Sequence, residues 1–336
     1  MNNHPLVSVI IPCYNAEQYV EESVRSIMQQ TYPTLEIIVI DDGSTDGTTD
    51  ILRQLATEDP RIRLIIHPQN KKLIVTLNEG LSVARGKYIA RMDADDIALP
   101  QRIALQVDVL ERHPEVVVVG SFLRAITGWR KFRKWVAPIN DTKIRSYLFV
   151  AAPFFHPTTM FRNGLPDLYY SEDAYRAEDY ELWTRLLKQG KGYNIPKVLL
   201  YYRLLPNSET RLGERDVTQR FKIFTKIHAN ILSGYGIYLS GHTQEIYTAS
   251  TVKTWTTPFV HRPLSELLSV FATIDQKVGK SNMPVAHALK GYLGLRLLAW
   301  ITCKGHRMRF SDMLEVLKSS YFYRGLLTLM LRRVKL

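Results

Sequence analysis

Hydrophobic residues in the first 120 positions follow two alternating patterns. Short apolar-rich runs at residues 7–11, 35–40, 62–66, 88–92 and 116–119 are separated by segments whose apolar residues recur every three or four positions. Runs of this length predict buried strands, and the second pattern predicts amphipathic helices. Strands that alternate with helices predict an α/β fold with a mostly parallel sheet built from βαβ units.

Local signals predict where some helices begin and end. Asn15 is followed three residues later by Gln18, which is typical of a capping box at the start of the helix that carries Val20, Val24 and Ile27. Gly86 follows the third helical segment and predicts its end.

The rest of the chain predicts two further parts. Residues 121–210 mix strands, loops and one clear helix at 178–188, and after Arg211 the pattern is helical, basic and rich in Leu and Tyr. We therefore expect three segments, at residues 1–120, 121–210 and 211–336.

Composition limits the class of protein. The chain has 336 residues, of which 46% are hydrophobic, enough for a large core. Cys13 and Cys303 lie far apart, which favours a reducing compartment over a disulfide framework. We expect neither a signal peptide nor a membrane-spanning helix, because no apolar run has the length that either requires.

The net charge of +12 is concentrated near the C-terminus. Residues 204–336 hold 19 basic and 8 acidic side chains, whereas residues 1–203 hold 25 and 24. Near the C-terminus, Arg324, Arg332 and Arg333 flank an apolar run. A helix of this composition is either an ordinary core helix with a charged end or one that binds an anionic bilayer surface. Nucleic acid is disfavoured, since no zinc-finger or RNP pattern is present.

Polar residues follow each of the first four predicted strands, at 12–17, 41–46, 70–72 and 93–96. Ligands of parallel sheets bind beyond the carboxyl ends of the strands, so one crevice could collect all four clusters. Asp93-Ala94-Asp95 either caps the next helix or holds a divalent cation, which prefers oxygen ligands. Asp41 and Asp42 form either a turn or a contact to a base or ribose, and no glycine-rich phosphate loop is present.

Four later residues have a structural and a chemical interpretation. Glu178 and Asp179 either favour a helix N-terminus or supply a general base. His156 is either a buried, hydrogen-bonded histidine or part of the same cleft. Arg203 lies either on a solvated rim or against phosphate, which suits its guanidinium group.

Three blocks together, at residues 7–15, 39–48 and 88–96, resemble the family 2 glycosyltransferases. The resemblance extends over residues 6–203, and residues 177–183 with Tyr202 and Arg203 make the chain most similar to bacterial enzymes that extend lipooligosaccharide or O-antigen, such as the β-1,3-glycosyltransferases.

The resemblance implies a GT-A fold, a UDP-sugar donor, Mn²⁺ or Mg²⁺, and inversion at the anomeric carbon. Residues 1–120 and 121–210 would then be the nucleotide-sugar and acceptor halves of the GT-A domain. The expected acceptor is a lipid-linked or surface oligosaccharide, and the expected location is cytoplasmic, at the inner face of the cell membrane.

The same resemblance assigns site residues by matching motif positions. Asp179 would be the base with Glu178 beside it, Asp95 the metal ligand, and Asp93 a group on the ribose side or a second ligand. Asp42 would hold the uracil, and His156 and Trp183 would lie on the acceptor side. The other expected nucleotide-sugar contacts are Pro12, Tyr14, Asn15, Glu17, Lys71, Ala94 and Arg203.

One position departs from the family pattern. Related chains often carry a histidine two residues after the arginine of the last strand, whereas this chain has Leu205 there. Metal affinity would then be lower, or another group would substitute.

A non-catalytic nucleotide-sugar-binding relative and a nucleotidyltransferase are the alternatives to a glycosyltransferase. The acidic residues disfavour the first, and the lack of a glycine-rich loop after the first strand disfavours the second.

Overall fold

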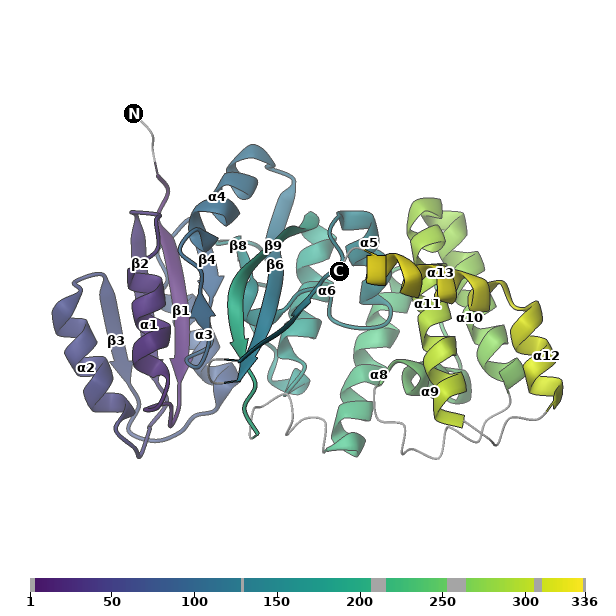
Figure 1. The fold of residues 1–336 in the computed structure, drawn as a ribbon, viewed down its shortest axis with the longest axis horizontal. Coiled ribbons are helices and arrows are strands. Elements are labelled where there is room, and N and C mark those ends of the chain that lie inside the picture. Colours follow the sequence, from purple (N-terminus) through teal and green to yellow (C-terminus); the bar gives the residue numbers. More distant parts are fainter. Residues whose placement is uncertain (1–3, 128–129, 207–215, 253–263, 305–309, 335–336) are drawn as a thin grey trace. The chain divides into compact units, whose positions relative to one another are not determined.

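The computed structural model describes residues 4–127, 130–206, 216–252, 264–304 and 310–334 (Figure 1). The chain forms two compact units. The first contains Met1–Asn140 and Phe154–Pro206, and the second contains Asp141–Pro153 and Asn207–Leu336.

A nine-stranded sheet forms the centre of the first unit, in the order β3-β2-β1-β4-β8-β6-β9-β5, with β7 paired to β6. The strands are β1 (Val7–Cys13), β2 (Leu35–Asp41), β3 (Ile62–Ile66), β4 (Tyr88–Arg91), β5 (Ile97–Ala98), β6 (Val116–Thr127), β7 (Arg130–Trp135), β8 (Met160–Arg162) and β9 (Lys191–Arg203). The first four are parallel, and so are β6 and β9, while β8 is antiparallel to β4 and β6. The predicted α/β architecture is confirmed, and the sheet is mixed because β8, β7 and β5 pair antiparallel with their neighbours.

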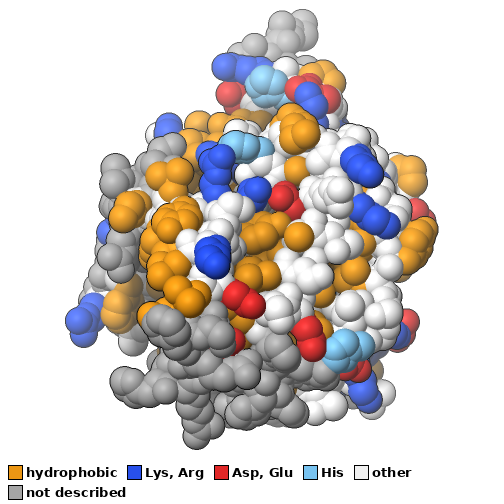
Figure 2. Space-filling view, turned by 90° about the vertical axis from the view of Figure 1, so that its right-hand side faces the viewer, with side chains coloured by type: hydrophobic (Ala, Val, Ile, Leu, Met, Phe, Trp, Pro, Cys, Tyr) orange, Lys and Arg blue, Asp and Glu red, His pale blue; other side chains and the backbone are white. Residues whose placement is uncertain are grey.

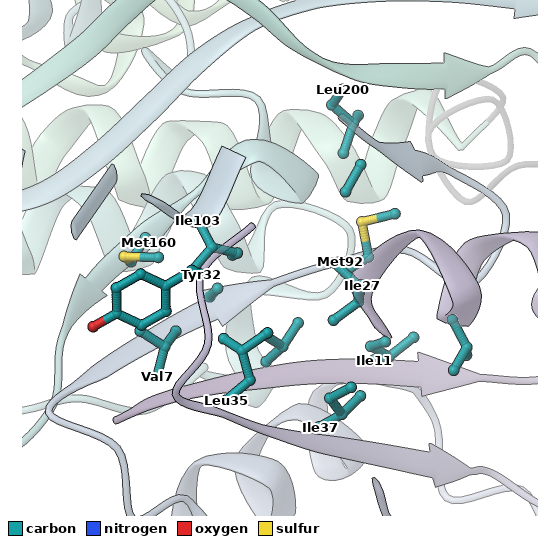
Figure 3. Packing of buried hydrophobic residues seen from close by; sticks show 14 of the residues in the cluster. Val7, Ile11, Ile27, Tyr32, Leu35, Ile37, Met92, Ile103, Met160 and Leu200 are labelled. Carbon is teal, nitrogen blue, oxygen red and sulfur yellow. The ribbon is translucent and has the colours of Figure 1, made fainter. Parts of the chain in front are cut away.

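Helices cover both faces of this sheet. They are α1 (Val20–Met28), α2 (Thr48–Glu58), α3 (Leu73–Val83), α4 (Arg102–Arg112) and α6 (Glu178–Gln189). Val9 and Ile11 of β1 lie in a buried cluster with Ile27 of α1 and Ile103 of α4 (Figure 3). Ile10 points to the opposite face, because side chains alternate along a strand. There a Cβ added to Gly80 of α3 would lie 2.6 Å from Ile10 Cγ2.

The structure confirms the first four predicted strands and the helix at 178–188, which is α6. The predicted strand at 116–119 is the beginning of a longer one. β6 continues to Thr127 because its second half pairs with β9 and β7. β9 (Lys191–Arg203) comes from a distant part of the chain and has no counterpart in the local pattern, whereas β7 (Arg130–Trp135) follows β6 almost directly.

The predicted capping box at the start of α1 is wrong. The N-cap residue is Tyr19, whose side chain makes no capping hydrogen bond. Asn15 lies in the left-handed region at φ 47°. Its Oδ1 instead accepts a hydrogen bond from the Thr45 N–H at 2.8 Å. Asn15 therefore joins two loops, because its side-chain oxygen bonds to Thr45 and does not cap α1.

The second unit is helical, as predicted for the C-terminal region. It contains α5 (Asp141–Leu148), α8 (Val217–Ser233), α9 (Gly241–Thr251), α10 (Leu264–Ser281), α11 (Met283–Lys304), α12 (Phe310–Lys318) and α13 (Ser320–Val334). The 141–153 segment belongs here because Ser146 Oγ donates to Val285 O at 2.9 Å and Arg296 Nη2 donates to Val150 O at 3.1 Å. Within the described residues, no helix is both long enough and apolar enough to cross a bilayer.

Helices α11 and α13 approach each other closely at Gly294 and Gly325. A Cβ added to Gly294 would lie 2.2 Å from Tyr321 O and 2.6 Å from the Gly325 nitrogen. Both atoms belong to backbone, so neither helix can make room by moving a side chain.

We expect Gly294→Ala to lower the free energy of unfolding of the helical unit by about 1–3 kcal/mol, because overpacking forces the two backbones apart. Gly279→Ala in α10 is the matched control. Its added Cβ would meet Ala286 Cβ at 3.7 Å, an ordinary contact, and alanine favours the helix. Thermal and urea unfolding would measure both variants, and equal stability of the two would contradict the close crossing.

Candidate active site

The loops that follow β1 and β2 are joined at the carboxyl edge of the sheet. The Asn15 N–H donates to Ser44 Oγ at 2.9 Å, and Glu17 Oε2 accepts from the Gly47 N–H at 2.7 Å. Tyr14 precedes these residues in the same loop, and half of its surface is exposed. Of the predicted donor contacts, Pro12 lies near the end of β1, and Tyr14, Asn15 and Glu17 share the loop that follows it. Asn15 and Glu17 also hold the loop after β2.

Asp42 organises the loop between β3 and α3. Its Oδ1 accepts from the Lys71 N–H at 2.8 Å and its Oδ2 from the Lys72 N–H at 2.9 Å. His67 Nδ1 lies 2.7 Å from the same carboxylate. The Asp42 side chain is almost fully buried, so any contact with a base would be shared with these partners. Lys71, the other donor contact expected in this region, is exposed.

Asp93, Asp95 and Asp96 form an acidic triad immediately after β4. Each offers a carboxylate oxygen, and these oxygens lie within 4.8 Å of one another. Burial and the neighbouring Asp93 raise the pKa of Asp95 to about 7. Burial and the other two carboxylates also raise the pKa of Asp96. Crowded carboxylates of this kind need a compensating positive charge.

Two buried arginines lie beneath the triad. The Arg91 guanidinium forms an ion pair with Asp93, while its Nε and Nη1 are buried without a hydrogen-bond partner among the described residues. Arg102 Nη2 donates to Arg91 O at 2.6 Å, and burial lowers the Arg102 pKa to about 9. Neither arginine was identified as a site residue from the sequence, because nothing local shows that a strand or helix arginine is buried.

Arg203 at the end of β9 holds the backbone of the triad. Its Nε donates to Asp95 O at 2.7 Å, and its backbone N–H donates to Asp96 Oδ1 at 2.9 Å. Its Nη2 donates to Glu22 Oε2 at 2.6 Å, and the guanidinium lies over the Tyr19 ring. Arg203 therefore positions Asp95 and Asp96, and a phosphate contact would be a further role.

The predicted base lies at the first turn of α6. Glu178 is buried, whereas Asp179 is partly exposed. Asp179 Oδ1 accepts from the Tyr180 N–H at 2.7 Å, which fixes this carboxylate at the helix N-terminus. Of the two, Asp179 has the access to solvent that a group acting on a bound hydroxyl requires.

Tyr170 connects the acidic triad with α6, and no sequence signal identified it. Burial raises its pKa, and the charges of Glu178, Asp179 and Asp93 act in the same direction. The charges of all three carboxylates therefore act on one buried hydroxyl. Asn78 of α3 clamps the Tyr170 backbone, accepting from its N–H at 2.7 Å and donating to its carbonyl at 2.8 Å.

His156 and Trp183 lie on the α6 side of the site. His156 Nε2 is 2.9 Å from Tyr170 Oη, and burial with the nearby Arg91 lowers the His156 pKa well below its usual range. The imidazole is therefore neutral. Trp183 is fully buried against His156 and Phe154, so a role for Trp183 toward an acceptor would act through His156.

The triad suits a hard divalent cation, since its donors are all carboxylate oxygens. Asp96 Oδ2 is buried and has no hydrogen-bond partner in the described part of the chain, which leaves it available to such a cation. Asp93, Asp95 and Asp96 are the one group of metal-binding side chains found among the described residues. Ala94, another expected donor contact, is buried. Leu205 lies just beyond β9.

Comparison with known sequences identifies related proteins. Residues 8–164 match the family described as Glycosyl transferase family 2. A glycosyltransferase of Haemophilus influenzae is 37% identical over 66% of this chain and 72% of its own length. EpsE of Bacillus subtilis is 37% identical over 60% and 74%. TuaG of Bacillus subtilis, named for teichuronic acid biosynthesis, is 32% identical over 62% and 82%.

Solved structures share the fold at low sequence identity. Residues 1–349 of Staphylococcus aureus TarS, in complex with UDP-GlcNAc, align with a TM-score of 0.59 over 87% of this chain and 86% of that one, at 19% identity. The mannosyltransferase PcManGT of Pyrobaculum calidifontis, in complex with GDP-Man and Mn²⁺, aligns with a TM-score of 0.55 over 86% of both chains, at 20% identity.

Proposed function

Because this chain belongs to glycosyltransferase family 2 and has the GT-A fold, we propose that it transfers a hexose or N-acetylhexosamine from a UDP-sugar to a glycan hydroxyl. The acceptor is a lipid-linked or surface oligosaccharide, and transfer inverts the anomeric carbon. Relatives named for teichuronic acid and amylovoran biosynthesis support a cell-surface polysaccharide. The complex of TarS with UDP-GlcNAc supports a UDP-sugar donor.

The observation that carries this proposal is the position of Tyr170. Its hydroxyl lies 2.9 Å from Nε2 of His156, whose ring contacts Trp183 of α6. Burial raises the pKa of this hydroxyl, and the charges of Glu178, Asp179 and Asp93 act in the same direction. A donor anchored at the triad and a base on α6 would therefore act on the same region, which a single displacement requires.

In the mechanism that we propose, Asp179 accepts the proton of the acceptor hydroxyl as its oxygen attacks the anomeric carbon. Asp93 and Asp95 hold the donor, and Arg203 keeps the Asp95 backbone in place. Mn²⁺ or Mg²⁺ held at the triad would neutralise the negative charge that develops on the departing diphosphate. Neutral His156 pairs with Tyr170 Oη at 2.9 Å, so neither side chain adds a charge to the site.

A donor screen tests the proposal. The protein is incubated with Mn²⁺ and UDP-glucose, UDP-galactose, UDP-GlcNAc or GDP-mannose, with and without membrane glycans, and the released nucleotide is measured. We expect UDP release from one UDP-sugar, stimulated by an acceptor. Release of GDP alone would overturn the UDP assignment, and transfer with retained anomeric configuration would overturn the single displacement. Family membership leaves no support for the nucleotidyltransferase alternative.

We also propose that the helical unit binds the anionic inner face of the cell membrane. Apolar side chains are exposed on α12 and α13, and Figure 2 shows hydrophobic groups gathered on one face of this unit with Lys and Arg among them. The exposed apolar residues are Met313, Leu314, Leu317, Tyr323, Leu327, Leu329 and Met330. Tyr323, Leu327 and Met330 share one face of α13, since they are spaced by four and three residues.

We expect the double substitution Leu327→Glu and Met330→Glu to weaken binding to phosphatidylglycerol vesicles roughly tenfold or more, by removing apolar burial and adding negative charge. Co-sedimentation measures this binding, with phosphatidylcholine vesicles for comparison. Tyr238→Glu is the control, because Tyr238 is the most exposed large hydrophobic residue described in the unit and lies outside α12 and α13. Equal binding by the double variant and the wild type would contradict a membrane role for α13.

A further inference from the structure

An aromatic cluster at the end of β7 has no role in the mechanism described so far. Trp135 is 42% exposed, although it is a large hydrophobic side chain. Its ring centroid lies 5.8 Å from that of Tyr202 in β9 and 6.2 Å from that of Phe155, which precedes the 3₁₀ turn His156–Thr158. Three separate segments of the first unit thus meet at one partly exposed indole.

The indole is supported from beneath. Phe155 and Tyr202 are both partly buried and pack against the main hydrophobic core of the unit. Trp135 is therefore held by two rings that are themselves anchored, while part of its surface faces solvent. A rigid exposed aromatic surface loses little conformational entropy when a ligand covers it.

Both supporting rings are chain neighbours of site residues. Tyr202 precedes Arg203, whose Nε donates to Asp95 O at 2.7 Å. Phe155 precedes His156, whose Nε2 lies 2.9 Å from Tyr170 Oη. The cluster is thus tied to the triad through β9 and to the α6 side through the 156–158 turn.

The type of exposed hydrophobic residue indicates the type of ligand. In the described part of the first unit, the exposed large hydrophobic residues are aromatic except for Ile66: Tyr14, Phe132, Trp135, Tyr169 and Tyr175. In the second unit they are mostly Leu and Met. Aliphatic groups suit a lipid or protein surface. Aromatic faces carry partial negative charge and attract the weakly positive axial C–H groups of a pyranose ring.

We infer that Trp135 is a stacking platform for a pyranose ring of the acceptor glycan. This inference rests on the proposed glycosyl transfer and identifies where the acceptor is held. Tyr202 and Phe155 position the indole. The indole distinguishes sugars by the face of the pyranose ring that covers it. It therefore favours sugars that present a continuous face of axial C–H groups.

Saturation-transfer NMR tests the platform directly, with the methyl β-glycosides of glucose, galactose and N-acetylglucosamine as probes. We expect the wild type to transfer saturation to the axial protons of at least one glycoside, and Trp135→Ala to lose this signal. Trp135→Phe should retain part of it, because a smaller ring remains. The matched control is Phe132→Ala, which removes another exposed ring of the same strand, three residues from Trp135.

A second measurement separates stacking from general damage. With the natural acceptor in a transfer assay, Trp135→Ala should raise the acceptor KM about tenfold or more and leave the Kd for UDP with Mn²⁺ unchanged. The inference is overturned if the wild type binds none of the glycosides, if Trp135→Ala binds them normally, or if Phe132→Ala is equally impaired. It is also overturned if UDP affinity falls in parallel. If the proposed glycosyl transfer were wrong, the wild type would release no UDP. Glycoside binding would still test Trp135, so the two failures can be told apart.

Discussion

Asp179→Asn is expected to slow glycosyl transfer by about 10²–10⁴-fold, the usual contribution of a positioned general base. The asparagine keeps the size of the side chain and can still accept from the Tyr180 N–H, so α6 should begin as before. It cannot take a proton from the acceptor hydroxyl. UDP binding should therefore be unchanged, since the lost interaction belongs to the transition state.

The measurements are initial rates of UDP release with acceptor and calorimetric titration with UDP and Mn²⁺. Glu172→Gln is a suitable control, because Glu172 is an exposed carboxylate on the neighbouring 3₁₀ turn Glu172–Ala174. Transfer by Asp179→Asn at the wild-type rate would remove Asp179 as the base. A comparable loss in Glu178→Gln, with Asp179→Asn unaffected, would assign the base to Glu178.

Asp95→Asn is expected to abolish most of the Mn²⁺-dependent component of UDP binding and to raise the Kd for UDP about 10²-fold, a loss of about 3 kcal/mol. Arg203 donates hydrogen bonds to the backbone carbonyl of Asp95 and to the side chain of Asp96, so the position of Asp95 is well defined. Asp50→Asn is the control, because that exposed carboxylate lies on α2, away from the triad. Unchanged titration of Asp95→Asn with UDP and Mn²⁺ would contradict the metal role.

The same site predicts a pH dependence. Since burial and Asp93 raise the pKa of Asp95 to about 7, a proton competes with the cation at lower pH. We expect Mn²⁺ affinity to rise between pH 6 and 8 and then level off. Without metal, the folded protein holds this proton more tightly than the unfolded chain, so the free energy of unfolding falls as pH rises from about 4 to about 7.

Thermal unfolding gives a readout of this dependence that is independent of catalysis. Mn²⁺ should raise the wild-type Tm at pH 8, because it neutralises the ionised triad. Asp95→Asn should raise the metal-free Tm at pH 8 by removing one of the crowded charges, and should lose most of the Mn²⁺ response. A wild-type Tm that does not respond to Mn²⁺ at any pH from 6 to 8 would contradict a cation site at the triad.

Part of the site could be located from the sequence because strand periodicity determines which residues end at the carboxyl edge. Asp42 follows β2, and Asp93 and Asp95 follow β4, and β2 and β4 are parallel neighbours of β1, so these side chains had to share an edge. The roles of Arg203 and Asn15 could not be read in this way. Their partners, Asp95 O and the Thr45 N–H, lie 108 and 30 residues away.

The α/β alternation, the carboxylates at the sheet edge and the family can be inferred from the amino-acid sequence, because these depend on local periodicity and on short blocks of residues. Which groups are buried and which segments meet depends on the folded chain. Arg91 and Arg102 lie beneath the triad, Tyr170 connects it with α6, and Trp135 rests on Phe155 and Tyr202. Burial and contacts between distant segments arise only when the chain packs, so no local pattern encodes them.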